Sequence, residues 1–132
     1  MRLSLNSALD TSANVSIGDI NGDGTLDVLL VNGRHSAGRS QVMLGDGHGH
    51  FPTVYPLTAD RYRSYSGQLV DLDGDGHLDV VAHMSATTIT PADVNRDGLI
   101  DLVVPARDGA QSVVYLNDGK GDFAAAKTVP LW

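Results

Sequence analysis

The segment DINGDGTLD at residues 19–27 indicates the architecture of this chain, because its pattern recurs twice further along the sequence. The recurrences are DLDGDGHLD at residues 71–79 and DVNRDGLID at residues 93–101. Internal similarity of this kind is typical of repeat architectures, in which one supersecondary unit is used several times. We therefore expect a repeat protein with the same local structure at each of these three segments, which we call the Asp loops.

Strand-like sequence flanks each Asp loop. A short alternating stretch comes before it, such as Asn14–Ile17. A run rich in Val and Leu comes after it and predicts a buried strand, at residues 28–31, 80–82 and 102–104. Each Asp loop is therefore expected to lie at the tip of a β-hairpin.

A second, Gly-rich element occurs twice, as VMLGDGHGHF at residues 42–51 and VYLNDGKGDF at residues 114–123. It is expected to join a third strand to a fourth, at residues 41–44 and 51–57 in one unit and 111–116 and 123–129 in the other. Four antiparallel strands make one blade of a β-propeller. The 15 Gly and 5 Pro, gathered in turn-like clusters, also favour short strands over long helices.

The spacing of the Asp loops is uneven. The first loop begins 52 residues before the second (71 − 19), but the second begins only 22 residues before the third (93 − 71). The middle unit is therefore expected to lack its third and fourth strands. We predict one all-β repeat domain, a partial β-propeller of about two and a half four-stranded antiparallel blades. It spans residues 1–132 as a blade-like unit at 13–58, a truncated unit at 65–84 and a blade-like unit at 87–130.

Composition narrows the classes of function. All 16 acidic residues are Asp, and ten of them lie in the Asp loops, which concentrates the net charge of −7 at three points. The 9 Lys and Arg form no basic run, which argues against nucleic acid and anionic lipid as partners. The absence of Cys excludes disulfides and thiolate chemistry. Apolar runs such as Val28–Val31 are far too short to span a membrane, and residues 1–6 contain no apolar signal-peptide stretch, so any secretion signal is expected to be missing or removed.

Oxygen-bearing side chains occupy positions 1, 3, 5 and 9 of every Asp loop. Calcium takes roughly six to eight oxygen ligands, and a curled loop directs alternate side chains inward. Glycine at position 6 permits the sharp turn that aims the position 7 carbonyl group at the ion. Three Ca²⁺ sites are therefore predicted. Their ligands are Asp19, Asn21, Asp23, Thr25 and Asp27; Asp71, Asp73, Asp75, His77 and Asp79; and Asp93, Asn95, Asp97, Leu99 and Asp101, with Thr25, His77 and Leu99 acting through their carbonyl groups.

The Asp loops have two alternative interpretations. EF-hand and dockerin loops share positions 1, 3, 5 and 6, and dockerin loops occur in pairs about 22 residues apart. An EF-hand, however, needs a bidentate acid at position 12, where this chain has Leu30, Ala82 and Val104. The loops could also be Asp-Gly turns without metal. Repulsion among three or four carboxylates in a pattern repeated three times argues against such turns.

The Asp loops resemble the FG-GAP and VCBS repeats of integrin-α-like β-propellers, in which Asp-x-Asp/Asn-x-Asp-Gly-x-x-Asp loops bind calcium between the first two strands of a blade. The segments GDGHGHF at 45–51 and NDGKGDF at 117–123 are similar to the turn that follows in VCBS-type blades. The resemblance covers nearly the whole chain and implies structural Ca²⁺ in an extracellular recognition scaffold. Because propellers of this family have about seven blades, the chain is expected to be a fragment, a trimmed or engineered form, or a protomer that closes a ring by oligomerising.

The predicted function is a non-enzymatic calcium-binding module used for recognition or adhesion outside the cell or at its surface, with a protein or glycan as partner. One alternative is a lectin-like carbohydrate binder, because the segment Asp60–Tyr65 contains two Arg and two Tyr. Another is the accessory part of a larger secreted enzyme. His48 and His50 are expected to be solvated turn residues, and no catalytic residue is predicted.

Overall fold

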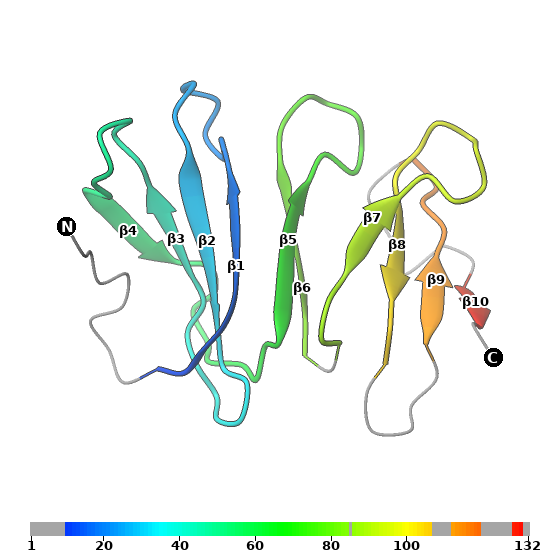
Figure 1. Cartoon of the computed structure of the whole chain (residues 1–132), viewed down its shortest axis with the longest axis horizontal. Coiled ribbons are helices and arrows are strands. Elements are labelled where there is room, and N and C mark those ends of the chain that lie inside the picture. The colour runs from blue at the N-terminus through cyan, green and yellow to red at the C-terminus, as the bar shows by residue number, and fades with distance from the viewer. Residues whose placement is uncertain (1–9, 85, 107–111, 120–127, 131–132) are drawn as a thin grey trace.

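The computed structural model describes residues 10–84, 86–106, 112–119 and 128–130, and within these ranges every regular element is a β-strand. The strands form three antiparallel sheets, and none of the sheets closes on itself (Figure 1). The prediction of an all-β, antiparallel fold is therefore confirmed, and the number of propeller blades stays a prediction. Within the described ranges no helix has the length and apolar character needed to cross a membrane.

The sheets follow one another along the chain. The first sheet has the order β1 (Ser12–Gly18), β2 (Asp27–Asn32), β3 (Gln41–Leu44) and β4 (Thr53–Pro56). The middle sheet pairs β5 (Ser66–Val70) with β6 (Asp79–His83). The third sheet contains β7 (Thr90–Ala92), β8 (Asp101–Val104), β9 (Val113–Tyr115) and β10 (Thr128–Pro130), in that spatial order. Residues 111 and 123–127 of the predicted strands lie outside the described residues.

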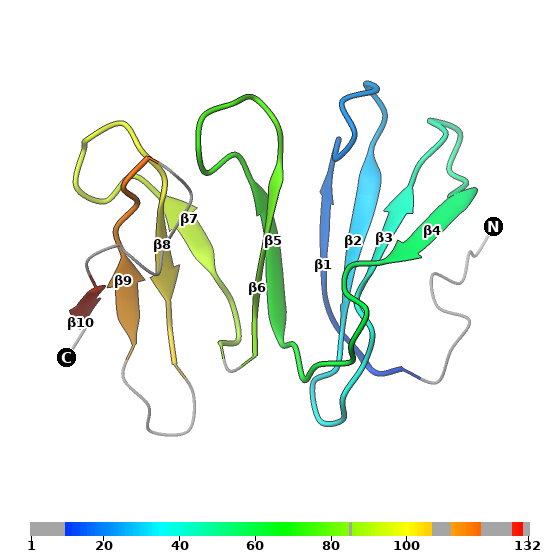
Figure 2. The ribbon, with the colours of Figure 1, turned by 180° about the vertical axis from the view of Figure 1, so that it is seen from behind.

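The three sheets are stacked face to face, with the middle sheet between the other two (Figure 2). One face of the middle sheet packs Leu69 and Val80 against the first sheet, in a cluster that includes Leu29. The opposite face packs Val70 and Val81 against the third sheet, in a cluster that contains Leu102 and Val104 among others. The alternation of side chains along β5 and β6 therefore supplies one apolar face to each neighbour.

A glycine permits the close approach of the first two sheets. A Cβ atom at Gly67 would lie 2.5 Å from Cγ2 of Val31, a distance that real Cβ contacts do not reach. The backbone of Gly67 also bonds across the gap, because its carbonyl oxygen accepts the Ser16 hydroxyl at 2.9 Å and its N–H donates to Asn14 Oδ1 at 3.3 Å. The two sheets are thus joined by polar bonds as well as by apolar packing.

The expectation of a buried strand at residues 80–82 is wrong. Residues 28–31 are buried along their whole length in β2, whereas Val80 and Val81 in β6 are only half-buried and Ala82 is exposed. The reason is the number of neighbouring strands, since β2 lies between β1 and β3, whereas within the described ranges β6 pairs with β5 alone. A two-stranded sheet leaves the flank of each strand open to solvent.

The segment rich in Arg and Tyr crosses from the first sheet to the middle sheet and is tied down by its backbone. Tyr62 and Gly38 exchange two N–H···O bonds of 2.9 Å, and Arg34 donates its N–H to the Ser64 carbonyl oxygen at 3.0 Å. Arg61 donates through Nε to the Ala37 carbonyl oxygen at 3.2 Å, and its guanidinium also contacts Asp10. These bonds give the segment a structural role in joining the two sheets.

Candidate metal centres

The Asp loops join β1 to β2, β5 to β6 and β7 to β8, as the hairpin prediction requires. All three lie at the same end of the stacked sheets (Figure 1). The glycines at position 6 have left-handed backbone conformations, with φ of 85° at Gly24, 88° at Gly76 and 89° at Gly98. This confirms the sharp turn expected there, because glycine adopts positive φ without steric cost.

The Asp at position 1 organises the backbone of each loop. Its Oδ1 accepts the N–H bonds of positions 4 and 5, and its Oδ2 accepts the N–H bond of position 6. The three distances are 2.7, 3.1 and 2.8 Å for Asp19, 2.8, 3.2 and 2.9 Å for Asp71, and 2.6, 3.2 and 3.0 Å for Asp93. A short carboxylate side chain is needed for such bonds to the nearby backbone, which explains why Asp begins every loop.

The residue at position 3 distinguishes the middle loop from the other two. In the first loop Asn21 donates its amide to Oδ2 of Asp23 at 2.8 Å, and in the third loop Asn95 donates to Oδ2 of Asp97 at 2.8 Å. The middle loop has Asp73 at this position, which as a carboxylate has no N–H to donate. Oδ2 of Asp75 therefore lacks the donor that its counterparts have, and among the described residues Oδ2 of Asp73 also accepts no hydrogen bond.

Residues at position 7 bond to the loops through their N–H groups. Thr25, His77 and Leu99 donate to Oδ1 of the position 5 Asp at 2.8, 2.8 and 2.9 Å. The Thr25 hydroxyl also donates to Oδ1 of Asp23, at 2.5 Å. This hydroxyl above all, together with the Thr25 N–H and the Asn21 amide, holds the pKa of Asp23 below its usual range. Coordination of Ca²⁺ by the position 7 carbonyl groups stays a prediction.

In the first and third loops, the Asp at position 9 links its loop to the residue that follows the third strand of the same sheet. Asp27 is fully buried, and its two oxygens accept the N–H bonds of Ile20 at 2.8 Å and Gly45 at 2.9 Å. Asp101 is also fully buried and accepts the N–H bonds of Val94 at 3.0 Å and Asn117 at 2.8 Å. These two carboxylates therefore close the end of a four-stranded sheet.

Asp79 has the same position in the middle loop but a different environment. It is half-buried, and Oδ2 accepts the Leu72 N–H at 2.9 Å. The middle sheet has no third strand that could supply the second donor, so Oδ1 of Asp79 accepts no hydrogen bond among the described residues. With the oxygens of Asp73 and Asp75, the middle loop thus keeps three carboxylate oxygens without a donor.

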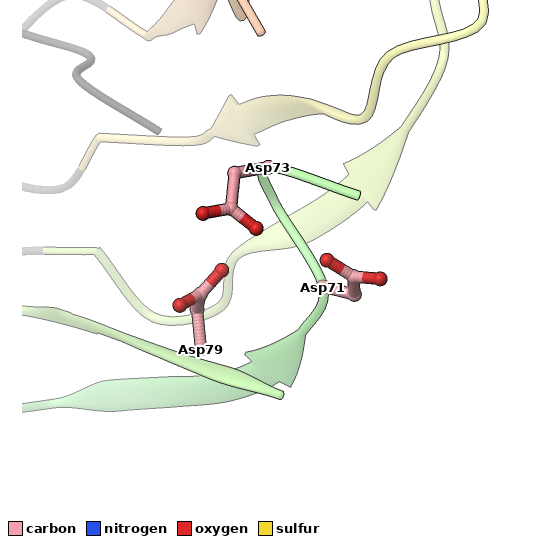
Figure 3. Close-up of side chains that lie close together, drawn as sticks. All are labelled: Asp71, Asp73 and Asp79. Carbon is pink, nitrogen blue, oxygen red and sulfur yellow. The ribbon is translucent and has the colours of Figure 1, made fainter. Parts of the chain in front are cut away.

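Three carboxylates of the middle loop gather at one point. Asp71, Asp73 and Asp79 each offer an oxygen within 4.8 Å of the others. Figure 3 shows the carboxylates of Asp73 and Asp79 pointing toward each other, with Asp71 beside them. The cluster does not include Asp75, which was predicted as a fourth ligand. Hard carboxylate oxygens at this spacing fit Ca²⁺, and a divalent cation would offset the mutual repulsion of the charges.

Two further features of the loops were not predicted from the sequence. Gly45 and Asn117 supply the backbone N–H groups that bond the position 9 Asp, and each is the fourth residue of the Gly-rich element that occurs twice. The signal in the sequence that could have indicated this role is that Gly45 and Asn117 have the same position in the two copies of the Gly-rich element. Position 4 also requires a left-handed backbone, with φ of 74° at Gly22, 77° at Gly74 and 64° at Arg96. Arg96 therefore has a backbone conformation that residues other than glycine rarely adopt.

The histidines of the Gly-rich element are exposed turn residues. Oδ1 of Asp46 accepts the N–H bonds of His48 at 2.8 Å and His50 at 3.1 Å, and these bonds lower the pKa of Asp46. Nδ1 of His50 lies 3.1 Å from Oδ2 of the same Asp46. His48 and His50 therefore lie in a turn that is held by hydrogen bonds to the Asp46 carboxylate.

Comparison with protein families shows that residues 19–82 match the model of the FG-GAP-like repeat. The matched segment extends from the first Asp loop through the middle Asp loop and most of β6. Comparison with curated proteins and with solved structures gives no significant match. The match supports the resemblance to FG-GAP-like repeats over residues 19–82.

Proposed function

We propose that this chain is a non-enzymatic, calcium-binding module of the β-propeller type, with Ca²⁺ as a structural ion and with a role in recognition or adhesion outside the cell. The observation that carries the proposal is the middle loop. The carboxylates of Asp71, Asp73 and Asp79 converge, and among the described residues Asp73, Asp75 and Asp79 each keep one oxygen without a hydrogen-bond donor. Carboxylate oxygens that converge in this way are suited to bind a cation, which offsets their mutual repulsion.

The chemistry of the donors favours Ca²⁺ over other common cations. All side-chain ligands would be oxygens of short carboxylates or amides on an exposed loop. Ca²⁺ tolerates roughly six to eight such ligands in flexible geometry. Mg²⁺ instead requires a near-ideal octahedron with oxygens at about 2.0–2.1 Å, and it gives up its bound water reluctantly. In the first and third loops, the amides of Asn21 and Asn95 bond the neighbouring Asp. If an ion bound there, these two hydrogen bonds would break, and the Asn amide oxygen and the Asp carboxylate would face the ion instead.

Two observations support the propeller-type module. The sheets stack face to face, which is how propeller blades pack, and every Asp loop lies at the same end of the stack. The family match supports the extracellular assignment, because FG-GAP-like repeats are typical of extracellular proteins. The expectation that the module binds a protein or glycan belongs to this proposal.

Isothermal titration with CaCl₂ and thermal unfolding in excess EDTA, in CaCl₂ and in MgCl₂ test the calcium proposal. Ca²⁺ at a hundred times its Kd should stabilise the fold by about 2.7 kcal/mol per site, with a much smaller effect of Mg²⁺. The variant Asp73→Asn should weaken binding at the middle site. Asp60→Asn is the matched control, because Asp60 is an exposed Asp outside the Asp loops.

A titration without heat, together with an unfolding temperature that Ca²⁺ does not change, would contradict the proposal. The loops would then be Asx turns closed by their own backbone N–H groups. Equal effects of Asp73→Asn and Asp60→Asn would show that Ca²⁺ binds diffusely to the acidic surface.

A second candidate is carbohydrate binding near Tyr62. The Tyr62 side chain is 44% exposed, and it lines a cavity of about 250 Å³ with Ser40, Ser64 and Met84. An exposed aromatic ring beside hydroxyl groups is suited to a sugar, since the ring covers the apolar face and the hydroxyls bond the polar edge. Binding to a glycan array should be lost in Tyr62→Ala and kept in Tyr55→Ala, whose ring is similarly exposed on β4 but does not line the cavity.

A further inference from the structure

The two ends of the stacked sheets differ in charge. The Asp loops lie at one end, and the connections from β2 to β3 and from β4 to β5 lie at the other in both views (Figure 1, Figure 2). These two connections, residues 33–40 and 57–65, contain four of the nine Lys and Arg of the chain and a single Asp. A negatively charged ligand is therefore repelled by the Asp loops and attracted to the opposite end.

A cavity of about 260 Å³ lies at this positively charged end. Its lining comes from four places in the chain that are distant in sequence. Ala13 belongs to β1, at the irregularity in its register with β2, and Arg34 follows β2. Tyr65 directly precedes β5, and Thr87 lies between β6 and β7. The stacking of the sheets therefore brings together three side chains that can donate hydrogen bonds and one small apolar side chain.

Arg34 has a backbone conformation that tight turns usually reserve for glycine. Its φ is 41°, and its turn is closed by the Ser36 N–H, which donates to the Gly33 carbonyl oxygen at 2.8 Å. The Arg34 N–H donates to the Ser64 carbonyl oxygen at 3.0 Å, which ties the turn to the segment before β5. Residues with a side chain rarely adopt positive φ, and those that do are concentrated at ligand-binding and active sites. The conformation thus points to a role for the Arg34 side chain.

The charge of Arg34 is not balanced by a neighbouring acid. Neither of the two ion pairs found among the described residues includes Arg34, and within those ranges its guanidinium donates no hydrogen bond. Tyr65 is positioned beside the same turn by an edge-to-face contact with His35, with ring centroids 6.4 Å apart and planes at 89°. The cavity therefore combines an arginine without an acidic partner, an aromatic ring and a threonine.

We propose that this cavity binds a carboxylate group, with Arg34 as the charged partner and Thr87 as a further hydrogen-bond donor. A guanidinium is planar, and two of its N–H groups match the two oxygens of a carboxylate. Arg34 is the single cationic residue in the lining, so the cavity balances one negative charge and suits a carboxylate better than a dianion. The small Ala13 leaves space for the carbon atoms next to the carboxylate, and the Tyr65 ring can cover them.

The carboxylate can belong to a free organic acid or to an acidic side chain of a peptide, since both offer the same group. NMR titration of the isotope-labelled whole chain separates the two sources, with sodium propionate as the free acid and acetyl-aspartate amide as the side chain. Amide shifts should saturate at residues 13, 33–36, 65 and 86–88, with a Kd of about 1–10 mM for the better probe. Sodium chloride at equal ionic strength should not produce them, and sodium sulfate should bind about tenfold more weakly.

Two substitutions of Arg34 test its role. Arg34→Gln should weaken binding of the better probe by about tenfold or more, because the charged fork is lost. Arg34→Gly should also lose binding, but its unfolding temperature should equal or exceed that of the wild type, because glycine adopts positive φ without strain. Arg39→Gln is the matched control, since Arg39 is exposed in the same connection but does not line the cavity. It should bind the probe like the wild type.

Several results would overturn the proposal. One is the absence of saturating shifts up to about 100 mM of either probe. Equal weakening by Arg34→Gln and Arg39→Gln would mean that this end attracts anions diffusely, and equal binding of sulfate would mean that charge alone is selected. Binding that survives in Arg34→Gly would place the anion elsewhere. Because the cavity and the Asp loops lie at opposite ends, calcium titration of Arg34→Gln should match the wild type, so the two proposals can fail separately.

Discussion

The first hairpin (β1 and β2) and the middle hairpin (β5 and β6) carry nearly the same Asp loop but are supported differently. In the first, Asp27 is fully buried and each of its oxygens accepts a backbone N–H bond. In the middle, Asp79 is half-buried and one oxygen accepts a bond. The difference is the third strand, since Gly45 follows β3 and the middle sheet has no such strand in the described part of the chain.

This comparison separates two ways of holding one loop. Where a third strand is present, its backbone N–H neutralises part of the charge of the position 9 carboxylate and closes the sheet. Where the strand is missing, carboxylate oxygens stay available, and we propose that Ca²⁺ takes the place of the missing donors. The middle hairpin should therefore be the part of the chain whose stability depends most on the ion.

The largest effect is expected from removing the position 9 carboxylate. Asp27→Ala leaves the N–H groups of Ile20 and Gly45 without an acceptor in a buried place, which should lower the free energy of unfolding by about 3–5 kcal/mol. Asp79→Ala removes one bond from a half-exposed place and should cost about 1 kcal/mol. Urea denaturation in excess EDTA measures both without a metal contribution. Equal losses would show that the third strand does not matter for this carboxylate.

Apolar packing should differ in the same direction. Leu29 of β2 is fully buried between sheets, and Leu29→Ala should cost about 2–4 kcal/mol. Val81 of β6 is half-buried, and Val81→Ala should cost about 1 kcal/mol because solvent already reaches part of the side chain. Urea denaturation again gives both values, with the exposed Met84→Ala as a control near zero. A larger loss for Val81→Ala would reverse the comparison.

Calcium should protect the middle hairpin more than the first. If Ca²⁺ replaces the missing donors, adding it should slow amide hydrogen exchange over residues 66–83 by about tenfold or more relative to EDTA. Residues 12–32 should change less, because Asp27 already has two donors. Exchange followed by mass spectrometry or NMR measures this, with Mg²⁺ as the control ion. Uniform protection along the chain would mean that the ion acts on global stability alone.

The smallest effect concerns position 4, where the third loop differs from the middle loop. Arg96 has a φ of 64°, and Arg96→Gly should stabilise the chain by about 0.5–1 kcal/mol because glycine adopts this conformation without strain. The reverse change Gly74→Arg should destabilise by a similar amount, since Gly74 has a φ of 77°. Thermal unfolding of both variants in EDTA tests the pair. A loss of stability in Arg96→Gly would point to an additional role of the Arg side chain.

Much of the fold and the loop geometry was accessible from sequence. The three recurrences located the hairpins, and the Gly at position 6 of each loop predicted the turns that the structure contains. The burial of residues 80–82 was predicted wrongly, because the sequence of this run shows that it is apolar but does not show how many strands lie beside it. The environments of Asp27 and Asp79 also could not be told apart, since both stand at position 9 of matching segments.

The repeat, the β-class, the short middle unit and the oxygen pattern of the Asp loops could be predicted from sequence, because they are properties of local order and spacing. Which carboxylates are bonded by the backbone, and which keep an oxygen without a donor among the described residues, depends on the tertiary structure, because the donors at position 9 include residues that are distant in sequence. The exposure of Leu26 and Val94 also depends on the stacking, because Leu78 and Leu72 at the same positions of the middle loop are half-buried and buried. Burial is a property of neighbours, and neighbours are set by how the sheets stack.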